Sequence, residues 1–239
     1  MSHLRKDLIT ATIAIVFFTL TLGIAYPLLT TGVSQVLFPN ASNGSRIELN
    51  GKVVGSKLIG QDFRVPALDR NGKPILDEEE EPVLVADPAY FQGRPSVTGY
   101  SADVTYFNNL GPNDKELSEF FEEELKIYLT RERRYAPGLA AADVPVDAVS
   151  TSASGVDPHI SEANARIQAH RVAAVRGLPL DRVLDLIGEH TDGRTLGLFG
   201  EPGANVLQLN LALDKTAPMG LKQVAYRPES ARRRGEGRR

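Results

Sequence analysis

The chain has 239 residues, no cysteine and a formal net charge of −3 at pH 7. A slightly acidic chain lacks the positive field on which broad nucleic-acid binding depends, so we expect no nucleic-acid partner. The lack of cysteine is compatible with an oxidising or a reducing compartment and excludes neither. The length allows one hydrophobic core with long insertions beside a membrane segment.

A long apolar run near the N-terminus is the strongest signal in the sequence. Residues 8–29 read LITATIAIVFFTLTLGIAYPLL and contain no charged residue. At about 1.5 Å per residue, such a helix is roughly 33 Å long and crosses a hydrocarbon core of about 30 Å. The run is longer than the apolar part of a secretory signal, and no A-x-A-like cleavage site follows it. We therefore expect a retained transmembrane helix at residues 8–30.

Charges beside this run predict how the chain crosses the membrane. Arg5 and Lys6 precede the run, whereas the next charged residue after it is Arg46. The positive-inside rule places residues 1–7 in the cytoplasm and the bulk of the chain outside. We expect a single-pass protein of the cell membrane.

Beyond the anchor, residues 31–217 are expected to form one extracytoplasmic domain of mixed α and β structure. A basic, apolar-poor tail at residues 218–239 is expected to be disordered. Asn50-Gly51 predicts the turn of a β-hairpin, and residues 65–89 contain two segments of loop character. The remaining patterns predict helices at 114–134, 161–176 and 180–193, and strands at 146–150 and 205–213.

The densest polar cluster is the segment 150–161, STSASGVDPHIS, which enters the helix expected at 161–176. Free backbone N–H groups and the positive dipole end at a helix N-terminus suit an anion. However, no Walker-type lysine accompanies the segment. The simpler interpretation is that Asp157 and Ser161 cap the turn and the helix.

The same segment allows a second interpretation, in which Ser152 or Ser154 is a nucleophile assisted by His159 and Asp157. A nucleophile elbow requires G-x-S-x-G, and TSASG has Thr151 in place of the first glycine. Triad partners also usually come from separate elements. We therefore expect no catalysis here. The four histidines of the sequence lack the spacing of a zinc site, so no metal is expected.

Gln168 is expected on the inward face of its helix, together with Ala165, Val172 and Val175. A buried amide without partners costs about 1–3 kcal/mol. Gln168 should therefore either tie the 150–161 segment to the helix or contact a ligand.

The apolar run has a pattern of its own. Thr12, Thr19, Gly23 and Thr30 fall within about 20° of one line at 100° per residue. Small and hydroxylated residues on one face let another transmembrane helix approach closely. We expect these four residues to form a contact face with a partner helix, while the rest of the helix lies in the lipid bilayer.

Several motifs follow one another along the chain: YPLLTTGVSQVLFPNASNGS, GSKLIGQDF, YFQGRPS, DAVSTSASGVDPHIS, the helix around Gln168 and Arg171, HTDGRTLGLFGEP and NVLQLNLALDK. Together they resemble the KdpC family, the C subunits of the Kdp high-affinity potassium-transporting ATPase of bacteria and archaea. The resemblance covers the chain to about Thr216, and it implies that residues 65–89 are a loop inserted between the GSKLIGQDF and YFQGRPS motifs. It implies a non-catalytic subunit that stabilises assembly and acts as a catalytic chaperone, raising the affinity of the ATPase subunit for ATP. The implied partners are a channel-like potassium-binding A subunit, a P-type ATPase B subunit and a small F subunit.

In that family the serine-rich segment is a candidate nucleotide-related motif. Carried onto this chain, the resemblance implies Ser152, Ser154, Gly155, Asp157 and Gln168. The expected orientation conflicts with direct contact, because ATP lies in the cytoplasm and these residues are expected outside. The implied ATP role is therefore weak or indirect. The alternatives are a membrane-anchored extracytoplasmic serine hydrolase and a binding protein without a fixed complex.

Overall fold

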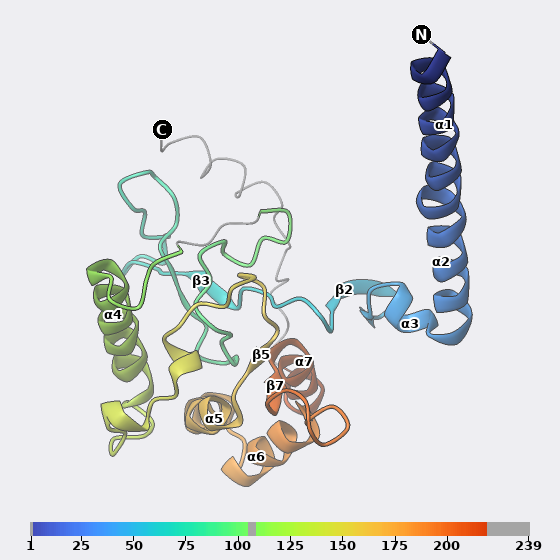
Figure 1. Ribbon diagram of the computed structural model, residues 1–239. Coiled ribbons are helices and arrows are strands. Elements are labelled where there is room, and N and C mark those ends of the chain that lie inside the picture. Colours follow the sequence, from blue (N-terminus) through green and yellow to red (C-terminus); the bar gives the residue numbers. More distant parts are fainter. Residues whose placement is uncertain (1, 105–108, 219–239) are drawn as a thin grey trace. The chain divides into compact units, whose positions relative to one another are not determined.

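The computed structural model describes residues 2–104 and 109–218 and divides into two compact units, residues 1–56 and 57–239 (Figure 1). Residues 219–239, which hold nearly all of the predicted tail, lie outside the described residues. The first unit contains the expected membrane helix and the hairpin, and the second contains the mixed helix and strand domain.

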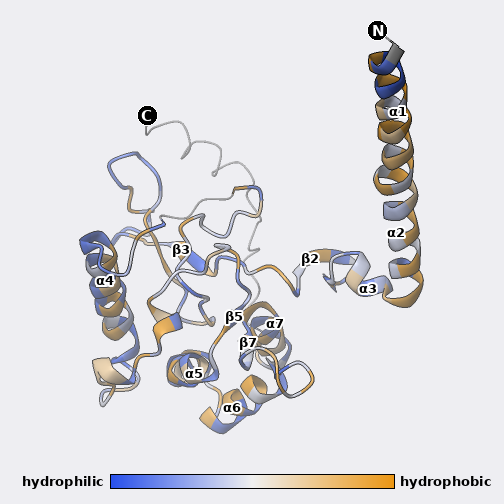
Figure 2. Cartoon of the chain, in the orientation of Figure 1, coloured by the Kyte–Doolittle hydropathy of each residue, from blue (hydrophilic) through white to orange (hydrophobic). Residues whose placement is uncertain are grey.

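The first unit begins with one long helix. It consists of α1 (Ser2–Phe18), the π-helical turn η1 (Thr19–Ala25) and α2 (Tyr26–Leu37). The span His3–Leu37 is long and apolar enough to cross a membrane, and none of its most apolar window is buried against the rest of the chain. In Figure 2 the hydropathy colours mark hydrophobic residues along most of this helix, with hydrophilic residues at its N-terminal end. The helix extends beyond the predicted bounds of residues 8–30 at both ends.

The π-helical turn has a cause in the sequence, because Pro27 lies two residues after its end. Proline has no backbone N–H, and its ring collides with the carbonyl group four residues earlier, here that of Gly23. The chain widens instead, and the backbone N–H of Tyr26 bonds to the carbonyl oxygen of Thr21, five residues back. The expectation of a regular helix is thus corrected. One extra residue in a turn rotates later residues by about 100°, so Thr30 leaves the line through Thr12.

A short helix and a hairpin complete the first unit. Helix α3 (Pro39–Ser42) leads into β1 (Arg46–Leu49), which pairs antiparallel with β2 (Lys52–Ser56). Asn50 and Gly51 have φ values of 52° and 74°. The predicted hairpin is confirmed, with both central residues of its turn at positive φ.

The second unit begins with a β-arm where an inserted loop was expected. Strands β3 (Arg64–Pro66) and β4 (Leu84–Ala86) pair antiparallel, and the chain between them is held by bridges from Leu68 to Pro74 and from Leu76 to Pro82. The region is therefore hydrogen-bonded along its length. Its acidic run, residues 78–81, is exposed at a turn.

Four helices and a small sheet form the core of the second unit. The helices are α4 (Lys115–Glu132), α5 (Glu162–Arg176), α6 (Leu180–Glu189) and α7 (Val206–Thr216). The antiparallel sheet has the order β5 (His159–Ile160), β7 (Gly203–Asn205), β6 (Thr191–Asp192). Helix α5 packs against α4 and α6, and both α5 and α7 contact β7 (Figure 1). Fully buried apolar side chains between these elements include Phe91, Ile160, Val172, Val183, Ile187, Leu209 and Leu213.

Two predicted strands prove wrong. Residues 146–150 form a 3₁₀ turn at Val146–Ala148, which follows another at Ala141–Asp143. Asn205 ends strand β7, and residues 206–213 belong to helix α7, whose first turn is capped by the side chain of Asn205. The alternation of leucines suggested one buried face, but residues on most sides of α7 are buried in the core: Val206, Leu207, Leu209, Asn210, Leu211 and Leu213. A helix enclosed on most sides does not reveal its period in the sequence.

The other predicted helices are confirmed with small changes at their ends. Helix α5 is capped by Ser161 and ends at Gly177, which has a φ of 65°. Helix α6 ends at Glu189, four residues before the expected end. Asp114 caps α4 by accepting a hydrogen bond from the backbone N–H of Glu116.

Candidate functional site

Two buried amide side chains bind the backbone of the YFQGRPS segment. The Gln168 Oε1 atom accepts from the Gln92 N–H at 2.9 Å, and its Nε2 donates to the Gln92 carbonyl at 3.1 Å. Asn210, on α7, makes the same pair of bonds to Phe91, at 2.9 and 3.0 Å. Each amide thus supplies the donor and acceptor that a neighbouring strand would supply. The segment is held between α5 and α7.

The contact of Gln168 differs from the expected one. Its inward position with Ala165 and Val172 is confirmed. However, it binds Gln92 instead of tying the 150–161 segment directly to the helix. Arg94, two residues after Gln92, makes the direct contacts with that segment.

Arg171 stabilises the same region from α5 with a side chain that is completely buried. It forms an ion pair with the equally buried Glu132, at 3.1 Å, and donates to the carbonyl groups of Pro88 and Tyr90 at 2.7 and 2.9 Å. A further N–H donates to Gln168 at 2.8 Å. Burial lowers the pKa of Arg171, and the charge of Glu132 opposes that shift. The charge is retained because every direction around the guanidinium holds an acceptor.

The network continues to the start of α5. Asn164 accepts from Gln168 and from the Tyr128 hydroxyl, both at 2.9 Å, and donates to Asp147 at 3.0 Å. The Asp147 carboxylate also accepts from the backbone N–H and the hydroxyl of Ser161, at 2.8 and 2.7 Å. The anion at the N-terminus of α5 is therefore a carboxylate of the chain itself.

The serine-rich segment is fixed from the other side by Arg94. This guanidinium donates to the carbonyl groups of Ser150 and Thr151 at 3.3 and 3.0 Å, to the Ser150 hydroxyl at 3.1 Å, and to Asp157 at 3.3 Å. Within the described residues, Arg94 is the arginine that bonds to the segment. Its guanidinium N–H groups donate to the backbone and side chains of the segment itself.

Position 155 in the segment requires a glycine. It has a φ of 70°, and a Cβ atom there would lie 2.7 Å from the Thr98 hydroxyl oxygen. Its carbonyl oxygen accepts from Ser96 at 2.6 Å. The Ser154 hydroxyl accepts from the N–H of Val156 at 3.2 Å. These contacts close the turn within the protein.

The capping interpretation of Asp157 and Ser161 is confirmed. Asp157 accepts from the backbone N–H of His159 at 2.9 Å, and Ser161 accepts from the N–H of Asn164 at 3.1 Å. Ser152, the remaining predicted residue, is buried. The segment is a turn, braced by Arg94, that enters a capped helix.

A charged cluster surrounds His159 at the surface. Its Nε2 lies 3.1 Å from Asp192, and its Nδ1 lies 3.7 Å from Asp157. Lys57 pairs with Asp192 at 3.0 Å. The facing carboxylate of Asp157 raises the pKa of His159 against partial burial, and Asp192 adds to the increase. Burial would raise the pKa of Asp157, but the hydrogen bonds from His159 and the charge of Arg94 outweigh it, and the pKa is lowered.

This arrangement does not support the serine hydrolase alternative. In a triad, one imidazole nitrogen faces the nucleophile and the other faces a carboxylate. Both nitrogens of His159 face carboxylates instead. The hydroxyl of Ser154 is engaged with the backbone of its own turn.

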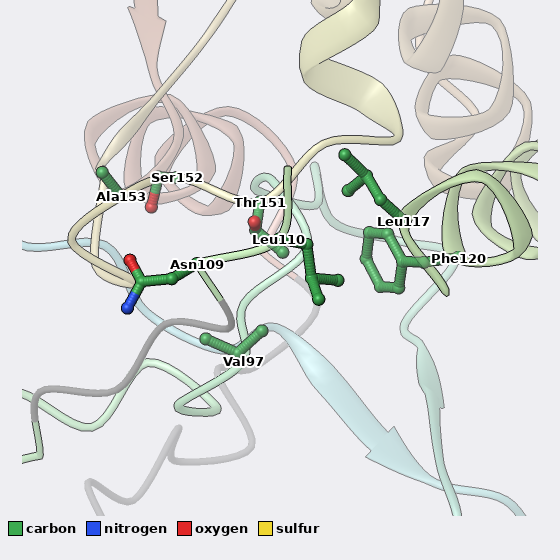
Figure 3. A pocket seen from close by; sticks show the side chains of 8 residues that line it. All are labelled: Val97, Asn109, Leu110, Leu117, Phe120, Thr151, Ser152 and Ala153. Atoms are coloured by element: carbon green, nitrogen blue, oxygen red, sulfur yellow. The ribbon is translucent and has the colours of Figure 1, made fainter. Parts of the chain in front are cut away.

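A pocket of about 390 Å³ lies between α4 and the serine-rich segment (Figure 3). Its lining consists of Val97, Asn109, Leu110, Leu117, Phe120, Thr151, Ser152 and Ala153. None of these residues is charged, and the leucine and phenylalanine side chains form one wall. The lining residues carry no cationic side chain that could pair with a triphosphate, whereas an uncharged or apolar group suits them.

Comparison with known proteins places these features in a family. The family model described as "KdpC: K+-transporting ATPase, c chain" matches residues 8–215. The chain belongs to the KdpC family. It is 38% identical over 218 residues to the potassium-transporting ATPase KdpC subunit of Koribacter versatilis, a match that covers 90% of this chain and 98% of the relative. It is 46% identical over 210 residues to the KdpC subunit of Polaromonas naphthalenivorans, covering 86% and 93%. The KdpC match confirms the resemblance found in the motifs.

The contacts described above join several of the motifs that carry the KdpC resemblance. The YFQGRPS motif meets Gln168 and Asn210, and the serine-rich motif meets Arg94. Sequence reasoning identified Gln168 and missed Asn210 and Arg94. The signal available for Asn210 was an amide flanked by leucines, Leu209 and Leu211, which is a costly residue to bury without a partner.

Proposed function

We propose that this KdpC-family chain is a non-catalytic subunit of an ATP-driven potassium uptake pump. It stabilises the assembled pump and acts as a catalytic chaperone that raises the ATP affinity of the P-type ATPase subunit. Its partners are a channel-like potassium-binding subunit, the ATPase subunit and a small third subunit. Membership of the KdpC family, over nearly the whole chain, carries this proposal.

The membrane helix supports a role in assembly. Its apolar side chains have no covering within the chain's own fold, so lipid and other transmembrane helices must cover them. A Cβ atom added at Gly23 would lie 3.9 Å from the methyl group of Thr19, so these two residues are neighbours on the helix surface. We propose that the contact face includes Thr12, Thr19 and Gly23, while the wide turn carries Thr30 to a different side.

We propose that the chain crosses the cell membrane once, with its N-terminus in the cytoplasm and its folded domain outside. Arg5 and Lys6 beside the apolar run support this orientation. It separates the serine-rich segment from cytoplasmic ATP. The effect on ATP affinity is then indirect and passes through the partner subunits.

The described contacts of the serine-rich segment support an indirect role. Asp147 occupies the N-terminus of α5, and the donors of Arg94 are directed to the segment itself. Ser152, Ser154, Gly155, Asp157 and Gln168 then act by shaping the domain that partners contact. They do not need to touch a nucleotide.

Two measurements test this proposal. The pump is purified with and without this chain, and the ATP dependence of its potassium-stimulated ATPase activity is measured. We expect loss of the chain to raise the KM for ATP and to lower the yield of assembled pump. Unchanged KM, uptake and assembly would sink the proposal.

The second measurement tests how the chain crosses the membrane. Ala153 is replaced by Cys in this cysteine-free chain, and labelling by an impermeant maleimide is expected from outside only.

A further inference from the structure

The connection between β6 and β7 presents three large apolar side chains to solvent. Leu196, Leu198 and Phe199 are 86%, 74% and 66% exposed. They lie within four consecutive residues, and contiguous apolar groups at a surface commonly mark a contact site. We call residues 194–201 the apolar tip.

The apolar tip is a rigid structure. Thr195 and Phe199 exchange two backbone hydrogen bonds, at 2.8 and 3.0 Å, and the N–H of Leu198 donates to Thr195 at 3.2 Å. At its base, Arg194 donates to both carboxylate oxygens of Glu201, at 2.9 and 2.8 Å. The apolar side chains are thus displayed on a fixed frame, which reduces the entropy lost on binding.

Leu196, at the centre of this turn, has a backbone conformation that is unfavourable for leucine. Leu196 has a φ of 55° and Gly197 a φ of 74°, the signs that a type I′ turn requires. The hairpin of the first unit meets the same requirement with Asn50-Gly51. A leucine at positive φ is strained, and the exposed side chain of Leu196 gains no packing in return. Strain that is not offset locally points to a function.

Charge around the apolar tip favours a protein partner over a lipid surface. The charged residues in 191–204 are Asp192, Arg194 and Glu201. The arginine is paired with the glutamate, and the aspartate is paired with Lys57 and His159. Loops that insert at anionic membrane surfaces carry unpaired basic residues, which this segment does not supply.

We propose that the apolar tip inserts into an apolar pocket on the extramembrane surface of another subunit of the pump, with Leu196, Leu198 and Phe199 as anchors. A few large side chains that fill a pocket carry most of the binding energy of many interfaces. This inference rests on the proposed function, because it requires partner subunits.

A photo-cross-linking amino acid in place of Leu198 tests the proposal in the assembled pump. The matched control carries the same group in place of Val146, which is 72% exposed but lies in a 3₁₀ turn away from the tip in sequence. We expect irradiation to join the Leu198 variant to another pump subunit with much higher yield than the control. Cross-linking to lipid only, or equal yields at both positions, would overturn the proposal.

A second variant separates assembly from folding. L196N places in the turn the residue that tolerates positive φ and removes the anchor. We expect its thermal midpoint to be unchanged or higher, while its affinity for the remaining pump subunits falls at least about tenfold. The control V146S should change neither property. Unchanged affinity in L196N would contradict the inference, whereas failure of the wild-type chain to co-purify with any pump subunit would contradict the proposed function instead.

Discussion

Two regions of the second unit place charged and polar side chains in opposite surroundings. The buried network joins Arg171, Glu132, Gln168 and Asn164 inside the core. The surface cluster joins His159 to its charged neighbours, whose side chains are between a quarter and a half exposed. The difference shows which polar contacts hold the fold and which ones respond to solution conditions.

The physical reason is the cost of removing a partner. A buried charge that loses its partner has no water to replace it, whereas an exposed charge regains its hydration. The buried network is therefore expected to control stability. The surface cluster is expected to contribute little energy, and the raised pKa of His159 is expected to make that contribution depend on pH. The following substitutions test this contrast, from the largest expected effect to the smallest.

Glu132 is the most sensitive position. E132Q keeps the shape of the side chain and leaves the charge of Arg171 buried without a counter-charge, so we expect the free energy of unfolding to fall by about 3–5 kcal/mol. Urea unfolding of the full chain in mild detergent measures this change. E123Q, on the exposed face of the same helix, is the control and should change it by less than about 0.5 kcal/mol. A small effect of E132Q would remove the distinction between the two regions.

Gln168 should rank next. Q168L leaves the backbone N–H and carbonyl of Gln92 without their partners and costs about 1–3 kcal/mol for each unsatisfied group. Q208L, at a half-buried position of α7, is the matched control. In pump that still assembles, a photoreactive ATP analogue should label this chain no more in wild type than in Q168L or Q208L. Labelling of this chain that is lost in Q168L and kept in Q208L would restore a direct nucleotide role for this residue.

His159 should give the surface cluster its pH dependence. Its raised pKa means that its stabilising contribution is complete below the ordinary value of 6.5 and is lost as pH rises through the folded-state pKa. The lowered pKa of Asp157 means that its contribution is present above its ordinary value of 3.8 and is lost as pH falls through the folded-state pKa. The stability difference between wild type and H159Q should therefore be largest between about pH 4 and 6.5. Its size should stay within about 1 kcal/mol, because the pair is solvent-screened.

One outcome of the pH measurement would contradict this prediction for His159. Unfolding is followed in urea at several pH values for wild type and H159Q, with H170Q as the control for a histidine elsewhere on the surface. A stability difference that grows as pH rises from 6 to 8 would show that the neutral imidazole is the stabilising form, contrary to the geometry of two facing carboxylates.

Lys57 should have the smallest effect. Its pair with Asp192 joins side chains that are 40% and 48% exposed, so K57M should change the free energy of unfolding by about 0–1 kcal/mol. That difference should shrink further when salt is added, because exposed charges are screened. A loss comparable with that of E132Q would show that exposure does not separate the two regions.

Local chemistry made several features predictable from the sequence. The apolar run is long enough for a membrane helix whatever surrounds it. Asn50-Gly51 sets a turn through the conformations that those two residues tolerate. Ser161 and Gly177 mark the ends of α5 by capping chemistry that acts within one turn. The family was also recognisable, because its motifs are continuous stretches of residues.

The remaining features depend on residues that are distant in the sequence. Helix α7 was predicted as a strand, since its leucines alternate and only packing against the core makes nearly all its sides apolar. The partners of the buried network lie 39 residues apart for Arg171 and Glu132, and 76 apart for Gln168 and Gln92. No local pattern identifies such partners. The same holds for the anion at the start of α5, which the sequence left open and which the fold supplies as Asp147.

The sequence by itself therefore determined the membrane helix, the hairpin, the capped helices and the family, because each depends on hydrophobic length, on the backbone preferences of single residues or on contiguous motifs. Only the tertiary structure decided that the serine-rich segment is closed by Arg94 and Asp147, because those contacts form when separate elements pack and their desolvated polar groups must find partners. The same packing leaves Leu196 strained and exposed at the apolar tip, where the chain itself offers it no contact.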